Sequence, residues 1–147
     1  MTKIEIMLVH AHSGLRWLVL GLLIYAIYNA FANKRSYEKR DKMINLFAMI
    51  SLHIQLLLGL ILYYTSTKVS FETGWMGKSI ERFYGMEHLI GMLIAIILVT
   101  VGRKMAEKQV SPEQKNKKII LWYSIALVLI LASIPWPFRE GLEGSWV

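Results

Sequence analysis

The sequence predicts an all-α fold, a transmembrane four-helix bundle that forms a single domain over residues 1–147. The chain is 55% hydrophobic but only 18% charged, and its apolar residues stand in long blocks. A soluble domain of this size would intersperse its polar residues to cover its surface. Four blocks approach the length of about 20 residues that crosses the hydrocarbon core of a bilayer. These blocks cover residues 13–32, 43–64, 83–102 and 119–136.

The connections between these segments fit the same fold. Residues 65–82 mix glycines, a tryptophan and a few charges, and we expect them to form a short cap at the membrane interface. The fourth segment runs into Pro135 and Pro137, which terminate helices because proline lacks a backbone donor. Trp136 suits the membrane–water interface.

Positive charge predicts the orientation of the bundle. Most of the 17 lysines and arginines lie in the first and third connections. The residues concerned are Lys34, Arg35, Lys39, Arg40 and Lys42, and then Arg103, Lys104, Lys108, Lys115, Lys117 and Lys118. By the positive-inside rule we expect both connections in the cytoplasm and both termini on the outer side. We therefore expect a multi-pass membrane protein. The net charge of +7 is a topology signal, and we expect no nucleic-acid partner.

The chain contains no cysteine. This excludes disulfides, thiolate metal sites, covalent c-type haem attachment and dithiol redox chemistry. Any redox role must therefore depend on a bound cofactor.

Histidines are the informative polar residues. His10, His12, His53 and His88 all lie in or beside apolar segments. An ionisable group at the centre of a span costs about 2.5–3.5 kcal/mol, so it is rarely accidental. His12, His53 and His88 come from three different segments and should converge on the outer half of the bundle. For His10 we favour an interfacial or structural role.

Two imidazoles on facing helices can hold a haem iron between them. With a rise of 1.5 Å per residue, His53 should lie about 8 Å deeper than His88, a mismatch that helix tilt would have to absorb. Arg16 follows His12 by four positions and shares its helix face. Its guanidinium either pairs with an anion such as a haem propionate or extends to the outer headgroups.

Four motifs resemble a family of small four-span bacterial membrane proteins described as cytochrome b-like, many of them from the Bacteroidetes group. They are H-x-H-S-G-L-R-W at residues 10–17, S-L-H-x-Q-L-L-L-G at 51–59, E-H at 87–88 and I-P-W-P-F-R at 134–139. The resemblance implies b-type haem and electron transfer, with His12, His53 and His88 as possible ligands. It also implies a place in the bacterial inner membrane, where the outer side with both termini is the periplasm. The absence of a histidine near the cytoplasmic side argues against two stacked haems.

The leading hypothesis is a membrane cytochrome that holds one non-covalent haem b near the outer face. It would be an electron carrier or redox subunit, rather than a stand-alone enzyme, and would exchange single electrons with quinol or a periplasmic partner. We expect His53 and His88 as axial ligands, His12 as the substitute for either, and Arg16 as the propionate partner.

Two alternatives stay open. The same histidines, with Glu87 as an extra ligand, could form a haem-free copper or zinc site or a quinone site. The chain could also be a non-catalytic accessory subunit of a respiratory or secretion complex, in which case its histidines would be structural.

Overall fold

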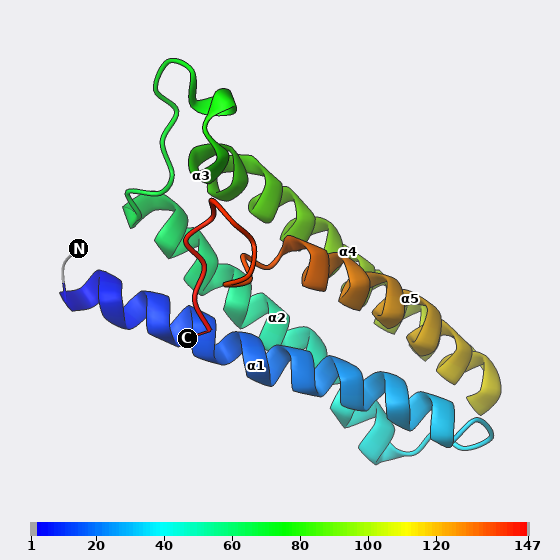
Figure 1. The fold of residues 1–147 in the computed structure, drawn as a ribbon. Coiled ribbons are helices and arrows are strands. Elements are labelled where there is room, and N and C mark those ends of the chain that lie inside the picture. Colours follow the sequence, from blue (N-terminus) through cyan, green and yellow to red (C-terminus); the bar gives the residue numbers. More distant parts are fainter. Residues whose placement is uncertain (1–2, 147) are drawn as a thin grey trace.

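Long helices account for nearly all of the regular structure in the computed structural model, which describes residues 3–146 (Figure 1). The long helices are α1 (Lys3–Ala32), α2 (Lys39–Thr65), α4 (His88–Glu107) and α5 (Pro112–Ser133). The short helix α3 (Ser79–Arg82) and a π-helical segment (Phe83–Glu87) lead directly into α4, so that helix is continuous from Ser79 to Glu107. A single 3-10 turn (Trp75–Gly77) interrupts the connection between α2 and α3. The described part of the chain is thus all-helical, as the sequence predicted.

Local sequence signals set the helix ends. The hydroxyl of Ser111 accepts a hydrogen bond from the backbone N–H of Gln114 (3.3 Å), and Pro112 occupies the first turn of α5, both of which favour a helix start. Helix α5 ends at Ser133, before the expected end of the segment at residue 136. The reason is Pro135, which disfavours helical geometry at the residue before it.

The long helices form two antiparallel hairpins that pack on each other (Figure 1). Helix α1 packs on α2 and α5, and α4 packs on α5 and α2. The short connections 33–38 and 108–111 lie at one end of the bundle, which we call the basic-loop end. At the opposite end, which we call the tail end, residues 134–146 turn back between the two hairpins.

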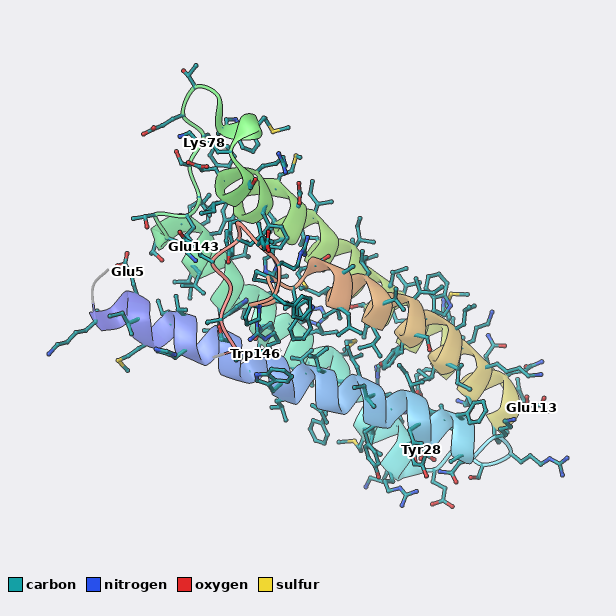
Figure 2. All side chains as sticks on the ribbon, in the orientation of Figure 1. Glu5, Tyr28, Lys78, Glu113, Glu143 and Trp146 are labelled. Atoms are coloured by element: carbon teal, nitrogen blue, oxygen red, sulfur yellow. The ribbon has the colours of Figure 1, made fainter. Side chains whose placement is uncertain are left out.

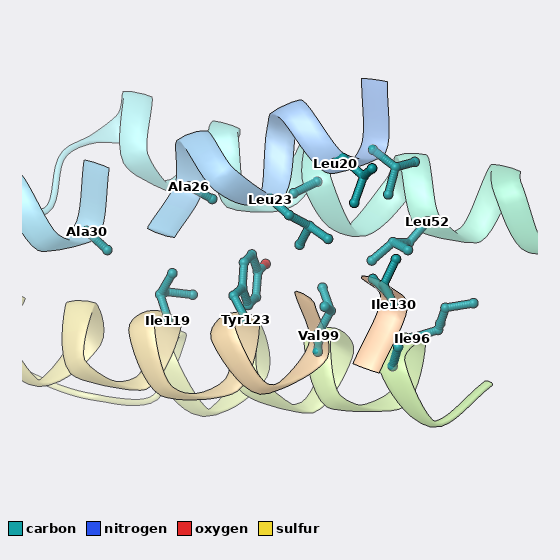
Figure 3. Packing of buried hydrophobic residues seen from close by; sticks show 14 of the residues in the cluster. Leu20, Leu23, Ala26, Ala30, Leu52, Ile96, Val99, Ile119, Tyr123 and Ile130 are labelled. Atoms are coloured by element: carbon teal, nitrogen blue, oxygen red, sulfur yellow. The ribbon is translucent and has the colours of Figure 1, made fainter. Parts of the chain in front are cut away.

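The core lies along the centre of the bundle, where side chains of α1 and α5 point toward one another (Figure 3). Tyr123, Leu23, Ile119 and Val99 are the largest fully buried side chains apart from Ile134. Buried alanines separate them and let the helix backbones approach closely. These alanines are Ala26, Ala30, Ala48, Ala95, Ala106 and Ala126.

The surface of the bundle is apolar, which is the reverse of the pattern in soluble proteins. Large exposed apolar side chains occur on all four long helices. They include Leu18, Ile24, Tyr28 and Phe31 on α1, Phe47, Ile54 and Leu57 on α2, Ile94 and Ile97 on α4, and Leu121, Ile125 and Val128 on α5. All four helical stretches are long and apolar enough to cross a membrane.

Polar side chains link the helices at the basic-loop end. Asp41 is buried and its carboxylate accepts a hydrogen bond from Asn29. The Tyr37 hydroxyl donates to Glu107 Oε1 (2.7 Å) and accepts from Asn45 Nδ2 (3.2 Å). Burial, followed by the hydrogen bond to Glu107, raises the pKa of Tyr37 above its ordinary value. The bond to Asp41 joins α1 to α2, and the Tyr37 hydroxyl links α2 to the end of α4.

Candidate functional site

A cavity of about 270 Å³ lies at the tail end, between the two hairpins. Its apolar wall is formed by side chains of α2, α4 and α5. These side chains are Leu52, Leu56, Met92, Ile96 and Ile130. Its polar wall is formed by His12, Arg16, Gln55 and His88. Residues 66–69 and the tail residues 143–145 complete the lining, and Figure 2 shows Glu143 at this end of the bundle. An apolar cavity with a few convergent polar groups is the usual form of a ligand site.

Two of the predicted histidines meet at this cavity. The ring centres of His12 and His88 lie 6.3 Å apart, with an angle of 69° between the ring planes. Both side chains are partly buried. Helix α1 supplies His12 and α4 supplies His88, directly after the π-helical segment Phe83–Glu87. Such π-helical insertions often occur at functional sites.

A backbone carbonyl orients the imidazole of His88. Its Nδ1 lies 2.7 Å from the carbonyl oxygen of Ser133 at the end of α5. Because a carbonyl can only accept, Nδ1 carries the proton and Nε2 keeps its lone pair. In a longer helix the Ser133 carbonyl would bind the N–H of residue 137. That residue is Pro137, which has no N–H, so the carbonyl is available to His88.

The rest of the Ile-Pro-Trp-Pro-Phe-Arg motif satisfies the neighbouring carbonyls of α5. Pro135 likewise removes the donor for Leu131, whose carbonyl instead accepts from the indole of Trp136 (2.8 Å). The Arg139 guanidinium donates to the carbonyls of Ala132 (2.9 Å) and Ile134 (3.2 Å). The motif therefore ends α5 with side-chain donors in place of backbone ones.

His12 is held differently from His88. The Cε1–Nδ1 edge of its ring faces Gly59 on α2, where a β-carbon would stand 3.2 Å from Cε1 and 3.8 Å from Nδ1. Gln55 Nε2 donates to the backbone carbonyl of His12 (2.8 Å), which ties α2 to α1 at this level. The His12 Nδ1 atom is buried and has no hydrogen-bond partner among residues 3–146.

Unpaired polar atoms are concentrated around the cavity. Within residues 3–146, five buried side-chain nitrogen or oxygen atoms lack a hydrogen-bond partner. Three of the five belong to lining residues, and they are His12 Nδ1, Arg16 Nε and Gln55 Oε1. Buried polar groups without partners are costly. Their clustering here makes this cavity the candidate ligand site among the described residues.

Arg16 is buried, and the tail takes up part of its hydrogen-bonding capacity. Its Nη2 donates to the carbonyls of Ser145 (3.1 Å) and Trp146 (2.8 Å). The indole of Trp17 donates to the same Trp146 carbonyl (3.0 Å), and Trp146 lies against α1 in Figure 2. The guanidinium also lies near the rings of Trp17 and Trp136. Arg16 thus fixes Ser145 and Trp146 of the tail beside the cavity.

The third predicted histidine lies apart from this pair. His53 Nδ1 donates to the carbonyl of Met49 in its own helix (2.8 Å). The face of α2 that lines the cavity carries Leu52, Gln55, Leu56 and Gly59, a spacing of three and four residues. His53 falls on a different face, so the structure brings His12 and His88 together without it.

Other candidates also lie away from the cavity. His10 is exposed near the start of α1. Glu87, the suggested extra metal ligand, is exposed and pairs with Arg82 through a contact of 2.8 Å. Within residues 3–146 no group of three or more His, Asp or Glu side chains is arranged to hold a metal ion.

Sequence reasoning missed several parts of the site. It did not assign the Ser133 carbonyl, the contact of Gly59 with His12, or Lys68, which lines the cavity and pairs with Glu143 through a contact of 3.7 Å. The Pro-Trp-Pro sequence was a usable signal for the carbonyl, since each proline frees an acceptor one turn earlier. Comparison of the chain with protein-family models, curated proteins and solved structures found no match.

Proposed function

We propose that this chain is a multi-pass protein of a bacterial inner membrane, with four spans and both termini on the periplasmic side. The exposed apolar side chains on every long helix support insertion in lipid. The basic residues in the connections at the basic-loop end support a cytoplasmic position for that end. The cavity then opens toward the periplasmic half of the bilayer.

The cavity would hold one non-covalent haem b, with His12 and His88 as the residues that bind its iron. This proposal rests on one observation. The centres of the two imidazole rings lie 6.3 Å apart. A metal–imidazole bond is about 2.0–2.1 Å long and a ring centre lies about 1 Å beyond its nitrogen, so two imidazoles on opposite sides of one iron have centres roughly 6 Å apart. In this proposal His12 replaces His53, which the sequence analysis favoured as a ligand.

The lining has the chemistry that a haem requires. Leu52, Leu56, Met92, Ile96 and Ile130 offer an apolar surface to the macrocycle. Arg16 and Lys68 supply cations for the propionates. The cavity of about 270 Å³ lies just under the usual range for ligand sites, so loading the macrocycle requires the tail residues over it to lift.

Bound haem would supply single-electron transfer, with quinol in the bilayer or a periplasmic protein as its partner. The residues of the chain would set the potential. The apolar wall limits solvent, and the hydrogen bond from His88 to Ser133 raises the basicity of the ligand. A bare zinc or copper site is less well supported, because such sites need three or four ligands and residues 3–146 bring only two histidines together.

An optical spectrum of the purified protein tests the proposal. The protein is expressed with added haem precursor, extracted in detergent, and recorded as a reduced-minus-oxidised difference. We expect a Soret band, split α/β bands and one haem per chain. A folded protein without these bands overturns the haem site. Stoichiometric copper or zinc in that sample would then support the metal site, and a quinone in its solvent extract would support a quinone site. A sample free of all three would support a purely structural subunit.

A further inference from the structure

The two histidines at the cavity differ in how firmly the protein holds them. His88 donates from Nδ1 to the Ser133 carbonyl, whereas the Nδ1 of His12 is buried and has no partner among residues 3–146. A hydrogen bond from the second ring nitrogen fixes the orientation of a metal-binding imidazole and raises its basicity. Loss of such a partner typically lowers metal affinity about 10–100-fold. The two rings are therefore unequal as ligands.

Packing of the parent helices reinforces this difference. His88 precedes Gly91 and Ala95, both of which are buried in the bundle. A β-carbon at Gly91 would overlap the Ser133 side chain, so the two helices are in close contact there. In α1, by contrast, none of the described residues before Arg16 is buried, and Ile4 and Met7 are each 70% exposed. Weakly packed segments open at low free-energy cost.

We infer that His88 is the permanent axial ligand and His12 the exchangeable one, and that a small neutral ligand of ferrous iron takes the place of His12. This inference rests on the proposed haem site. The ligand class is a diatomic molecule, because it must share the space beside Gly59 with the displaced ring, which is already so close that a β-carbon at Gly59 would stand 3.2 Å from it. The site would then bind a small molecule in addition to carrying electrons.

Carbon monoxide binding to the haem-loaded full chain tests the inference. The reduced wild-type protein is mixed with increasing CO and the Soret band is followed with time. We expect a CO complex whose rate of formation levels off at high CO, because release of His12 then limits the reaction. In His12→Ala the rate should rise linearly with CO, without a plateau. His12→Asn, which keeps a polar side chain, serves the same purpose if the alanine variant does not fold.

Haem affinity supplies a readout that does not depend on CO. Titration of haem into the apo variants should give a dissociation constant roughly 10-fold or more higher for His88→Ala than for His12→Ala. His53→Ala is the matched control and should behave as the wild type in both measurements.

The outcomes separate this inference from the function on which it rests. A wild-type protein that binds haem but forms no CO complex overturns the exchangeable ligand and leaves the cytochrome proposal intact. Equal haem affinities and equal CO kinetics in His12→Ala and His88→Ala overturn the inequality of the two ligands. A wild-type protein without a Soret band overturns the proposed function, and this inference with it.

Discussion

The imidazole of His12 on α1 meets the imidazole of His88 on α4, with 6.3 Å between ring centres, although α1 packs mainly on α2 and α5. The two rings meet across the cavity at the tail end, where the helical hairpins are separated by the tail. This pairing, and not the depth of each histidine along its own helix, determines which residues can share a ligand.

The pairing predicts a specific pattern among histidine variants. His12→Ala and His88→Ala should each abolish the bis-imidazole spectrum, whereas His53→Ala should keep it, because His53 is bonded to Met49 in its own helix. The measurement is the reduced-minus-oxidised spectrum normalised to protein. His88→Ala should also lower the free energy of unfolding by about 1–3 kcal/mol, because the Ser133 carbonyl loses its donor. Loss of the spectrum in His53→Ala alone would contradict the pairing.

Replacement of Gly91 by alanine is expected to change the redox potential of the bound haem. A side chain at this position would overlap Ser133, so Gly91→Ala should push α5 away and weaken the hydrogen bond from His88. We expect a lower basicity of the ligand and hence a shifted midpoint potential, together with a stability loss of about 1–3 kcal/mol from overpacking. Potentiometric titration and thermal unfolding measure the two effects.

Gly102→Ala is the matched control for Gly91→Ala. It overlaps Trp122 in the same α4–α5 interface, but near the basic-loop end. It should lower stability to a similar extent and leave the midpoint potential unchanged. An equal shift of potential in both variants would show that helix spacing alone is responsible, and that the Ser133 bond has no special part.

The hydrogen bonds of Arg16 to the tail predict an energetic coupling between α1 and the tail. Arg16→Ala and truncation after Gly144 should each destabilise the protein, because both remove the bonds from Nη2 to the Ser145 and Trp146 carbonyls. Their effects should not add, since the same contacts are lost in each. The expected coupling in a double-mutant cycle of unfolding is about 0.5–3 kcal/mol. Strict additivity would mean that Arg16 acts elsewhere than on the tail.

The raised pKa of Tyr37, at the basic-loop end, predicts that the free energy of unfolding depends on pH in the alkaline range. Tyr37→Phe removes the bond to Glu107 and should cost about 1 kcal/mol at neutral pH. Burial raises the pKa of Tyr37 in the folded protein, whereas the unfolded chain ionises near the ordinary value of about 10. The stabilising effect of this residue is therefore fully present below pH 10 and declines as pH rises above it.

The measurement is the unfolding free energy of wild type and Tyr37→Phe between pH 7 and 11. The gap between the two proteins should narrow above about pH 10. Tyr64→Phe is the control, because Tyr64 is 86% exposed, and its gap from wild type should stay near zero. A gap for Tyr37→Phe that is constant or widens with pH would contradict the raised pKa.

The sequence by itself determined the helices of this protein. Each long helix follows from a local property, the run of apolar residues, and Pro135 and Ser111 mark ends that neighbouring residues dictate. The same local reasoning identified His12 and His88 as candidates, because a histidine in an apolar run is visible without knowing its neighbours.

Only the tertiary structure decided which histidines meet. Whether His53 or His12 faces His88 depends on the rotation of α2 and α1 about their axes and on the order of helices around the bundle, neither of which composition reveals. The role of the Ser133 carbonyl depends on the close approach of α5 to Gly91, and the role of Arg16 depends on the path of the tail back to α1. These contacts join residues far apart in the chain, and their geometry is set by how side chains fill the space between helices.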